Sequence, residues 1–249
     1  MSSSPEIRKL TTPQELFAVA AEELIRAAEA AVSQRGRFTI ALSGGSTPKN
    51  LYTLLATNAR SSLPWDRMFF FWGDERHVGP QHPDSNYRMC EECLLSKVPV
   101  PPGNVFRIPA ENPDAAAAAE AYEQTLRKFF ALEPGSVPRL DLILLGIGPD
   151  GHTASLFPET AALNEKSRLA VANWVEKLNT SRITLTLPVL NAARIVMFLV
   201  SGTDKAPAVR AVLESDTSGE QYPAKLVRPT EGQLIWLVDR AAASELAAN

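Results

Sequence analysis

The stretch Leu142–Pro158, LILLGIGPDGHTASLFP, joins a run of apolar residues directly to a glycine-rich loop. Residues Leu142–Leu145 form the continuous apolar run that is typical of a strand covered on both faces, as in the parallel sheet of an α/β fold. The glycines and the proline that follow end any regular structure. Ligands in such folds bind beyond the carboxyl ends of the strands, so we expect a functional site in this loop.

Asp150 and His152 are the two residues of this loop that can carry chemistry. In an extended segment, a spacing of two places both side chains on one face. A carboxylate beside an imidazole can fix its tautomer and stabilise its protonated form, as a general base requires. On spacing alone, an equal alternative is that Asp150 caps the next turn and His152 lies in a polar loop.

Helix signals occur in two segments that precede this region. Thr12, Pro13 and Glu15 form a capping box with proline at the first helical position, and Gly36 ends the helix that they begin. The alanine-rich segment Asp114–Leu132 predicts a second amphipathic helix, since alanine is the strongest helix former. We expect the preceding residues, Asn112 and Pro113, to cap this helix.

Strands alternate with helices along the chain. This alternation predicts an α/β fold with a doubly wound, mostly parallel Rossmann-like sheet in a single domain over residues 1–249. We expect about the first nine residues to be disordered. The predicted strands are Phe38–Leu42, Met68–Trp72, Leu140–Leu145, Arg182–Leu187, Ile195–Val200 and Leu234–Val238.

The composition favours a globular protein with a small partner. Of 249 residues, 45% are hydrophobic and 21% are charged, and the net charge of -3 argues against a nucleic-acid binder. No segment has the pattern of a secretory signal or a membrane span, so we expect a cytoplasmic protein that does not bind membranes. We also expect the protein to be a monomer. Cys90 and Cys93 lie three apart on an expected helix, which suits neither a disulfide framework nor a four-ligand metal site.

A second glycine-rich segment, Leu42–Tyr52 (LSGGSTPKNLY), follows the first long strand. Its two glycines let an anion approach the backbone, and Ser46 or Thr47 can cap a helix that Pro48 opens. Orphan N–H groups and the positive helix end then face one point, as a phosphate-binding turn requires. A plain tight turn is the alternative, and the segment matches no nucleotide-binding motif. The candidate phosphate ligands are Ser43, Gly44, Gly45, Ser46 and Thr47.

Two further strand ends carry charged residues. Lys205 falls in the first turn of a predicted helix, where a cation interacts unfavourably with the helix dipole. A bound phosphate would make the position favourable for a cation. A lysine that points to solvent is an equal alternative, because exposed charges are strongly screened. Asp74, Glu75 and Arg76 crowd the end of another apolar strand. All these loops belong to the same expected edge of the sheet, which suggests a phosphosugar site.

These blocks together resemble a known family. The segments ALSGGSTP, GDERHV, HPDSNY, GIGPDGHTASLFP, RITLTLPVLNAA and SGTDKA occur in the order and spacing of 6-phosphogluconolactonases, from about Leu10 to about Val238. The resemblance implies the fold shared with glucosamine-6-phosphate deaminases and ribose-5-phosphate isomerases. It also implies hydrolysis of 6-phosphoglucono-δ-lactone to 6-phosphogluconate in the oxidative pentose phosphate pathway, with a phosphosugar lactone as the small-molecule partner and without a cofactor or metal.

The resemblance also implies roles for individual residues. His152 is expected to be the general base, Asp150 to orient it, and Arg76 or backbone N–H groups to stabilise the oxyanion. Asp74 is expected to bind sugar hydroxyls or Arg76. The 6-phosphate ligands are expected to be Gly44, Gly45, Ser46 and Lys205, with Arg182 as a further contact.

Three alternatives remain beside this hypothesis. A related deaminase or isomerase is one, but the deaminase motif continues to a glutamate five residues past the histidine, where this chain has Phe157. A sugar-phosphate sensor is another, although a sensor needs no base beside its ligand. A metal site of His77, His82 and Asp74 lacks a convincing further ligand. The family often has a proline-rich segment before the RITLT block, whereas residues 176–181 of this chain contain no proline. The resemblance therefore supports the role of the neighbouring Arg182 less strongly than the other roles.

Overall fold

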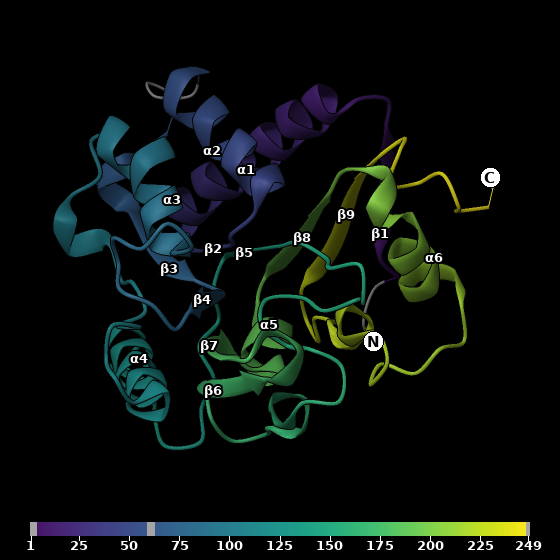
Figure 1. The fold of residues 1–249 in the computed structure, drawn as a ribbon. Coiled ribbons are helices and arrows are strands. Elements are labelled where there is room, and N and C mark those ends of the chain that lie inside the picture. The colour runs from purple at the N-terminus through teal and green to yellow at the C-terminus, as the bar shows by residue number, and fades with distance from the viewer. Residues whose placement is uncertain (1–3, 59–62, 248–249) are drawn as a thin grey trace.

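The architecture is organised around a six-stranded sheet (Figure 1). The computed structural model describes residues 4–58 and 63–247. Every neighbouring pair of strands in this sheet is parallel, which confirms the predicted α/β fold with a mostly parallel sheet. The strands, in spatial order, are β1 (Glu6–Leu10), β9 (Gln233–Asp239), β8 (Ile195–Val200), β5 (Leu142–Leu145), β2 (Phe38–Leu42) and β3 (Met68–Trp72).

The chain changes direction in the sheet between β2 and β5. From β2 the chain proceeds outward to β3, whereas from β5 it proceeds to β8 and β9 on the other side. The loops that follow β2 and β5 therefore diverge and leave a crevice between them, which is where open α/β sheets bind ligands. Both glycine-rich segments of the sequence lie at this crevice.

Six α-helices are present in the described part of the chain. The long helix α1 packs against β2 and β9 and lies beside α2, so both cover the same region of the large sheet (Figure 1). None of the described helices is long and apolar enough to cross a membrane. The helices are α1 (Pro13–Arg35), α2 (Ser46–Asn58), α3 (Asn86–Cys93), α4 (Ala115–Phe129), α5 (Leu187–Ala192) and α6 (Ala206–Glu214).

The predicted signals of the first helix are confirmed. The Thr12 hydroxyl accepts a hydrogen bond from the backbone N–H of Glu15, and Gly36 ends α1 in the left-handed conformation at φ 72°. The cap of α4 was predicted wrongly, because Asp114 rather than Asn112 or Pro113 accepts hydrogen bonds from the first N–H groups of the helix. A carboxylate at this position satisfies two donors at once and complements the helix dipole.

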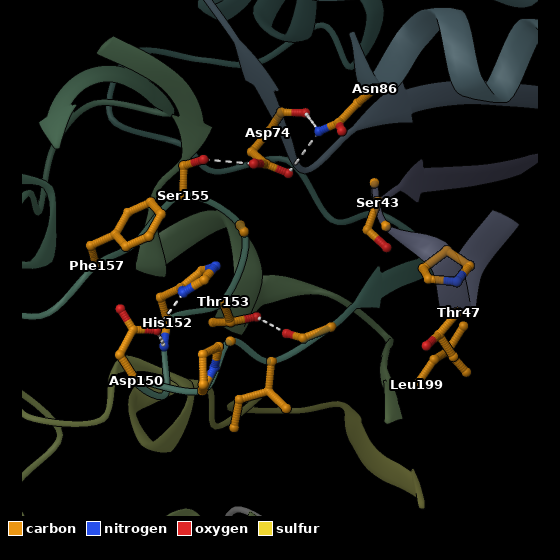
Figure 2. A pocket seen from close by; sticks show the side chains of 18 of the residues that line it. Ser43, Thr47, Asp74, Asn86, Asp150, His152, Thr153, Ser155, Phe157 and Leu199 are labelled. Carbon is orange, nitrogen blue, oxygen red and sulfur yellow. Dashed lines mark hydrogen bonds and ion pairs between the residues drawn. The ribbon is translucent and has the colours of Figure 1, made fainter. Parts of the chain in front are cut away.

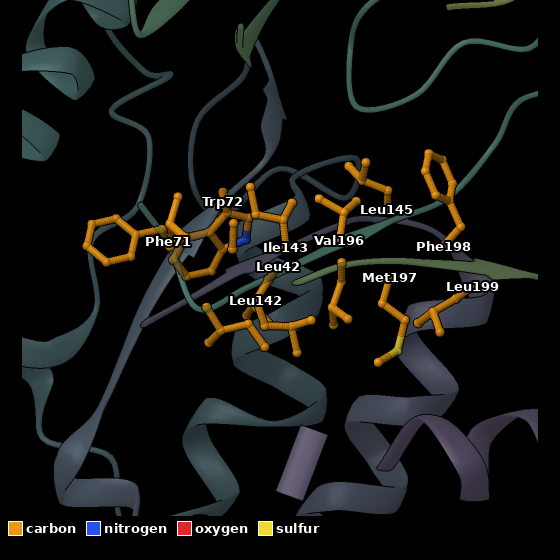
Figure 3. Close-up of a cluster of buried hydrophobic side chains, with 14 of the residues drawn as sticks. Leu42, Phe71, Trp72, Leu142, Ile143, Leu145, Val196, Met197, Phe198 and Leu199 are labelled. Atoms are coloured by element: carbon orange, nitrogen blue, oxygen red, sulfur yellow. The ribbon is translucent and has the colours of Figure 1, made fainter. Parts of the chain in front are cut away.

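The core lies between the strands of the large sheet and its helices. Side chains from β2, β3, β5 and β8 interdigitate at its centre (Figure 3). Every residue of β2 and of β5 is buried, which is why β5 appears in the sequence as a continuous apolar run and β2 as one interrupted only by Thr39. Because these strands are buried, they provide a rigid base for the loops that follow their carboxyl ends.

A second sheet was not predicted. Its three antiparallel strands are β4 (Asp74–Arg76), β7 (Thr180–Leu185) and β6 (Ala170–Val175), and α4 packs on β6 and β7. The charged segment DER has no apolar pattern, so its strand conformation depends on pairing with β7. This small sheet adds a wall to the crevice, because β4 follows β3 and β7 returns the chain toward the large sheet.

The expectation that about nine N-terminal residues are disordered was wrong for residues 6–9, which belong to the strand Glu6–Leu10. This segment forms β1, which pairs in parallel with β9 at the edge of the sheet. Charged side chains and a half-exposed Ile7 give it the composition of an edge strand, which gains its order from backbone hydrogen bonds to β9 rather than from burial. Residues 1–3 lie outside the described residues.

Candidate active site

An open cavity of about 470 Å³ lies at the carboxyl ends of β2, β5 and β8, against the small sheet. This volume is within the usual range for small-molecule sites. The structure brings together every candidate site residue predicted from the sequence. They are Ser43, Gly44, Gly45, Ser46, Thr47, Asp74, Arg76, Asp150, His152, Arg182 and Lys205.

Asp150 and His152 form a hydrogen-bonded pair at one end of this cavity (Figure 2). Nδ1 of His152 lies 2.5 Å from Oδ1 of Asp150, and the second carboxylate oxygen pairs with the ammonium of Lys177. Within the described part of the chain, no group forms a hydrogen bond with Nε2 of His152. The predicted contact between Asp150 and His152 is therefore present, although the segment is a turn rather than extended. Oδ1 of Asp150 also accepts a hydrogen bond from the N–H of His152 at 3.3 Å, so Asp150 caps this turn as well.

Glycines allow the loop to hold this pair. A Cβ atom on Gly148 would lie 2.0 Å from Nδ1 of His152 and 2.7 Å from Oδ1 of Asp150, so a side chain there cannot coexist with the pair. Gly151 adopts φ 75°, in the left-handed region that glycine tolerates. Its carbonyl also accepts a hydrogen bond from the N–H of Ala224, which anchors the loop to the C-terminal part of the chain.

Asp150 is ionised in this environment. Partial burial raises the pKa of its carboxyl, but hydrogen bonds from His152 and Lys177 outweigh burial and hold the pKa well below its usual range. An ionised carboxylate can only accept hydrogen bonds. Nδ1 of His152 must therefore be the donor, and in the neutral ring the lone pair lies on Nε2.

Phe157 fixes the plane of the imidazole. Its ring stacks on His152 with the two centroids 4.1 Å apart and an interplanar angle of 24°. The phenyl group is only 5% exposed, so it forms a dry wall beside the imidazole. A phenyl group at this position can orient His152 but can neither donate nor accept a proton.

The three charged residues of β4 face in different directions because successive side chains of a strand alternate. Asp74 and Arg76 line the cavity, whereas Glu75 points away and is buried. Oδ2 of Asp74 accepts a hydrogen bond of 2.6 Å from the Ser155 hydroxyl, and the Asn86 amide donates to the carbonyl of Asp74 at 3.0 Å (Figure 2).

Glu75 has a structural position at the start of α3. Its carboxylate accepts hydrogen bonds from the backbone N–H groups of Arg76, Asn86 and Tyr87 and from the Ser85 hydroxyl. Burial raises the pKa of Glu75, although these hydrogen bonds oppose the rise. The GDER segment thus combines two cavity residues with one that anchors the next helix.

Arg76 and Arg182 lie opposite each other on β4 and β7. Both line the cavity, and Nε of Arg182 is buried without a hydrogen-bond partner. Burial lowers the pKa of Arg182, and the positive charge of Arg76 lowers it further. Like charges that face each other across a sheet are unfavourable, so an anion bound between them would remove both the repulsion and the unmet hydrogen bond.

The glycine-rich loop after β2 leads directly into α2. The helix begins at Ser46, and the N–H of Lys49 donates to the carbonyl of Gly45, so Gly45 is the capping residue rather than Ser46 or Thr47. Gly45 adopts φ 105°, which explains the glycine there. The first N–H groups of the helix, on Ser46 and Thr47, therefore lie at the cavity.

Lys205 approaches the cavity from the loop after β8. It ends a short 3-10 turn, η6 (Thr203–Lys205), and immediately precedes α6 instead of lying in its first turn. The ammonium lies 3.0 Å from Oδ2 of Asp204, and the side chain is 26% exposed. Lys205 thus lines the cavity rather than extending freely into solvent.

Several residues of the site were missed by sequence reasoning. Asn86 and Ser155 were present in the quoted blocks without a role, and Lys177 lies in the segment that departs from the family pattern. The contact of Asn86 with the glycine-rich loop after β2 explains Gly44, because a Cβ on Gly44 would lie 1.9 Å from the amide oxygen of Asn86. No local signal marks such contacts between distant segments.

The two histidines outside the cavity make loop contacts. Nε2 of His77 lies 2.7 Å from the carbonyl of Asn112, and Nδ1 of His82 accepts from the N–H of Asp84. In the described ranges, no three histidine, cysteine or acidic side chains are grouped as metal ligands would be. Cys90 and Cys93 lie on α3 as expected, and burial raises the pKa of both thiols.

Comparison with known proteins identifies the family. The family model described as glucosamine-6-phosphate isomerases/6-phosphogluconolactonase matches residues 11–236. The chain belongs to this family. A relative named 6-phosphogluconolactonase from Nostoc sp. is 45% identical over 231 residues, which are 93% of this chain and 94% of the relative. The resemblance drawn from the motifs is thereby confirmed.

Solved structures of the family share the fold. The 6-phosphogluconolactonase from Trypanosoma brucei superimposes with a TM-score of 0.87 at 33% identity, over 99% of this chain and 100% of that one. A monomeric glucosamine-6-phosphate deaminase superimposes with a TM-score of 0.80 at 22% identity, over 96% and 99% of the two chains. At that identity, the deaminase shares the fold alone.

Proposed function

We propose that this protein hydrolyses 6-phosphoglucono-δ-lactone to 6-phosphogluconate, the second step of the oxidative pentose phosphate pathway. The observation that carries the proposal is the Asp150–His152 pair, whose Nε2 has no protein partner in the described chain, inside a cavity that also contains a phosphate-type loop. Relatives named 6-phosphogluconolactonase, similar over nearly the whole chain, support the same reaction.

The two ends of the cavity suit the two functional groups of the substrate. His152, Asp150 and Phe157 lie at one end, and Ser43 and Thr47 lie toward the other (Figure 2). In the substrate, the lactone carbonyl and the arm that carries the 6-phosphate are attached to the two ring carbons on either side of the ring oxygen, so they project from separate points of the ring. We place the carbonyl beside His152 and the phosphate at the start of α2, where free N–H groups and Lys205 favour an anion.

The reaction then follows from the hydrogen-bond pattern. Nε2 of His152 takes a proton from a water molecule as its oxygen bonds to the lactone carbonyl carbon, while Asp150 holds Nδ1–H and stabilises the imidazolium. Arg76 or a backbone N–H group stabilises the oxyanion of the tetrahedral intermediate. When the intermediate collapses, the bond to the ring oxygen breaks and the imidazolium returns the proton to that oxygen. The product is the open-chain acid.

The remaining polar residues position the sugar. Asp74 is held by Ser155 and Asn86, so its carboxylate is fixed where it can accept hydrogen bonds from sugar hydroxyls. Arg182 supplies a partly buried positive charge without a carboxylate partner in the described chain, which suits contact with the phosphate or the oxyanion. Neither role requires a metal or a cofactor.

Phe157 argues against the deaminase alternative. The deaminase motif has a proton-transferring glutamate where this chain has a phenyl group stacked on His152. A sensor without catalysis is disfavoured by the geometry of the pair, because a binding module needs no base with a free lone pair.

A coupled assay tests the proposal. Glucose-6-phosphate dehydrogenase generates the lactone, and phosphogluconate dehydrogenase reports its hydrolysis as a second NADPH, at mildly acidic pH where spontaneous hydrolysis is slow. We expect this protein to accelerate the second step, and His152→Ala to lose about 100- to 10,000-fold of that acceleration. His82→Ala, at an exposed histidine outside the cavity, is the matched control. No acceleration by the parent protein would refute the lactonase proposal.

A further inference from the structure

We infer that Lys177 is a positioning residue for the reaction: from the turn of the β6–β7 hairpin, it holds Asp150 in the orientation that keeps His152 active. This inference rests on the proposed function. It concerns a residue in the segment whose sequence departs from the family pattern, and the contacts that support it connect two segments far apart in the chain.

The position of Lys177 is set by a tight turn. The residue lies in η5 (Glu176–Leu178), which connects β6 to β7. Asn179 closes this turn in the left-handed conformation at φ 47°, and its N–H donates to the carbonyl of Glu176 at 2.9 Å. On either side, Val175 and Thr180 are paired in the small sheet. The hairpin therefore places Lys177 over the cavity from a rigid base.

Lys177 makes two contacts with the catalytic end of the cavity. Its ammonium pairs with Oδ2 of Asp150, and the same ammonium lies 4.8 Å from the centroid of the Phe157 ring. The ring of Phe157 in turn stacks on His152. Asp150 and Phe157 each contact both His152 and Lys177, so the four side chains form a closed set.

The two oxygens of the Asp150 carboxylate bind different partners, and this arrangement fixes the orientation of the carboxylate. Oδ1 of Asp150 binds His152, and Oδ2 binds Lys177. A carboxylate held at both oxygens cannot rotate away from Nδ1, so the ring keeps its proton on Nδ1 and its lone pair on Nε2. Without Lys177, Oδ2 would have no partner among the described residues. Only the hydrogen bonds from Nδ1–H and N–H of His152 to Oδ1 would then hold the carboxylate, and it would sample other orientations.

This role differs from that of an ordinary surface ion pair. The Lys177 side chain is 52% exposed, and exposed pairs contribute little to folding stability. We therefore expect its removal to leave the melting temperature nearly unchanged while it lowers turnover. If the contact were merely structural, removal of Lys177 would lower the melting temperature and leave turnover nearly unchanged.

The first test is a double-mutant cycle measured with the coupled assay. Lys177→Met should lower kcat about tenfold with little change in KM, and Lys177→Arg should recover most of the loss, because a guanidinium can also bind the carboxylate. In the Asp150→Asn background, Lys177→Met should have no further effect. Lys166→Met, at an exposed lysine outside the cavity, is the matched control and should behave like the parent.

The second test does not depend on activity. Nitrogen-15 NMR of the imidazole side chains, assigned with His152→Ala, reports which ring nitrogen carries the proton. We expect the Nδ1–H tautomer of His152 in the parent and in Lys166→Met, and a mixture of tautomers in Lys177→Met.

The possible outcomes distinguish a failure of the inference about Lys177 from a failure of the proposed lactonase function. A parent that hydrolyses the lactone together with a Lys177→Met variant of unchanged kcat and unchanged tautomer would overturn the inference and leave the proposed function intact. Additive effects of Lys177→Met and Asp150→Asn would also overturn it, since they would mean that Lys177 does not act through Asp150. A parent without lactonase activity would refute the proposed function, and the tautomer measurement would still decide the role of Lys177.

Discussion

Oδ1 of Asp150 lies 2.5 Å from Nδ1 of His152, and this single contact determines which nitrogen of the ring can act as a base. Asp150 is ionised, because hydrogen bonds from His152 and Lys177 outweigh the effect of burial on its pKa. It can therefore only accept, so Nδ1 carries the proton and Nε2 carries the lone pair. The loop thus selects a tautomer before any substrate binds.

The substitution Asp150→Asn reverses this selection. An amide can present its NH₂ group to Nδ1, which favours the tautomer with the proton on Nε2 and removes the base. We expect kcat to fall about 100-fold or more, with the affinity for 6-phosphogluconate nearly unchanged. Steady-state kinetics and a direct binding titration measure the two quantities. A variant with the turnover of the parent would exclude Asp150 from the mechanism.

Gly148→Ala tests whether the loop geometry matters for the same pair. The added Cβ would lie 2.0 Å from Nδ1 of His152, so the ring or the loop must shift. We expect kcat to fall about 100-fold, as for other displacements of about 1 Å in active sites. Gly79→Ala, where no atom lies within 4 Å of the added Cβ, is the control and should retain full activity. Equal turnover in both variants would mean that the pair tolerates displacement.

The sequence predicts the strands that are buried on both faces. Residues 142–145 and 195–200 are continuous apolar runs, residues 38–42 are apolar apart from Thr39, and each segment forms the strand that this pattern indicates. By contrast, β1 and β4 have polar or charged patterns, because their order comes from backbone pairing with β9 and β7. Such pairing joins segments far apart in the chain, and no local pattern encodes it.

The same distinction applies to the site. Asp150 and His152 could be identified because their interaction is local and belongs to one motif. Lys177 lies 27 residues away from Asp150, in a turn whose sequence has no special feature, and only the fold brings the two together. Asn86 is similar, since its amide reaches β4 from the start of α3. The sequence thus predicts the local chemistry but not the residues that hold it in place.

Arg182→Leu should separate stability from binding. In the parent, the Arg182 guanidinium faces Arg76 across the small sheet and has a buried Nε without a partner. Its removal should raise the free energy of unfolding by about 0.2–1 kcal/mol without ligand. The affinity for 6-phosphogluconate should fall about tenfold, because a charged hydrogen bond to the anion is lost.

Thermal unfolding with and without 6-phosphogluconate measures both effects of Arg182→Leu. The variant should melt above the parent when the ligand is absent and should be stabilised less by its addition. Arg210→Leu, at an exposed position on α6, makes the same change in charge and should alter neither quantity. A lower melting temperature with unchanged affinity would assign Arg182 to the fold rather than to the ligand.

Lys205→Ala tests the phosphate end of the cavity. Lys205 is a partly buried cation that lines the same cavity as the start of α2, and its ammonium lies 3.0 Å from Oδ2 of Asp204. A charge-assisted contact with phosphate contributes about 1.5–3 kcal/mol, so the Kd for 6-phosphogluconate should rise roughly 10- to 150-fold. The Kd for gluconate, which has no phosphate, should be the same in variant and parent.

The control for this experiment is Lys49→Ala, an exposed lysine of α2 close to the same loop. It makes the same change in net charge but loses only long-range attraction, which 0.15 M salt largely screens. A direct contact from Lys205 should therefore persist at that ionic strength, whereas any effect of Lys49→Ala should fade. If Lys205→Ala and Lys49→Ala bind 6-phosphogluconate equally well at 0.15 M salt, Lys205 does not touch the phosphate. The free N–H groups of Ser46 and Thr47 would then be left as the candidate phosphate ligands.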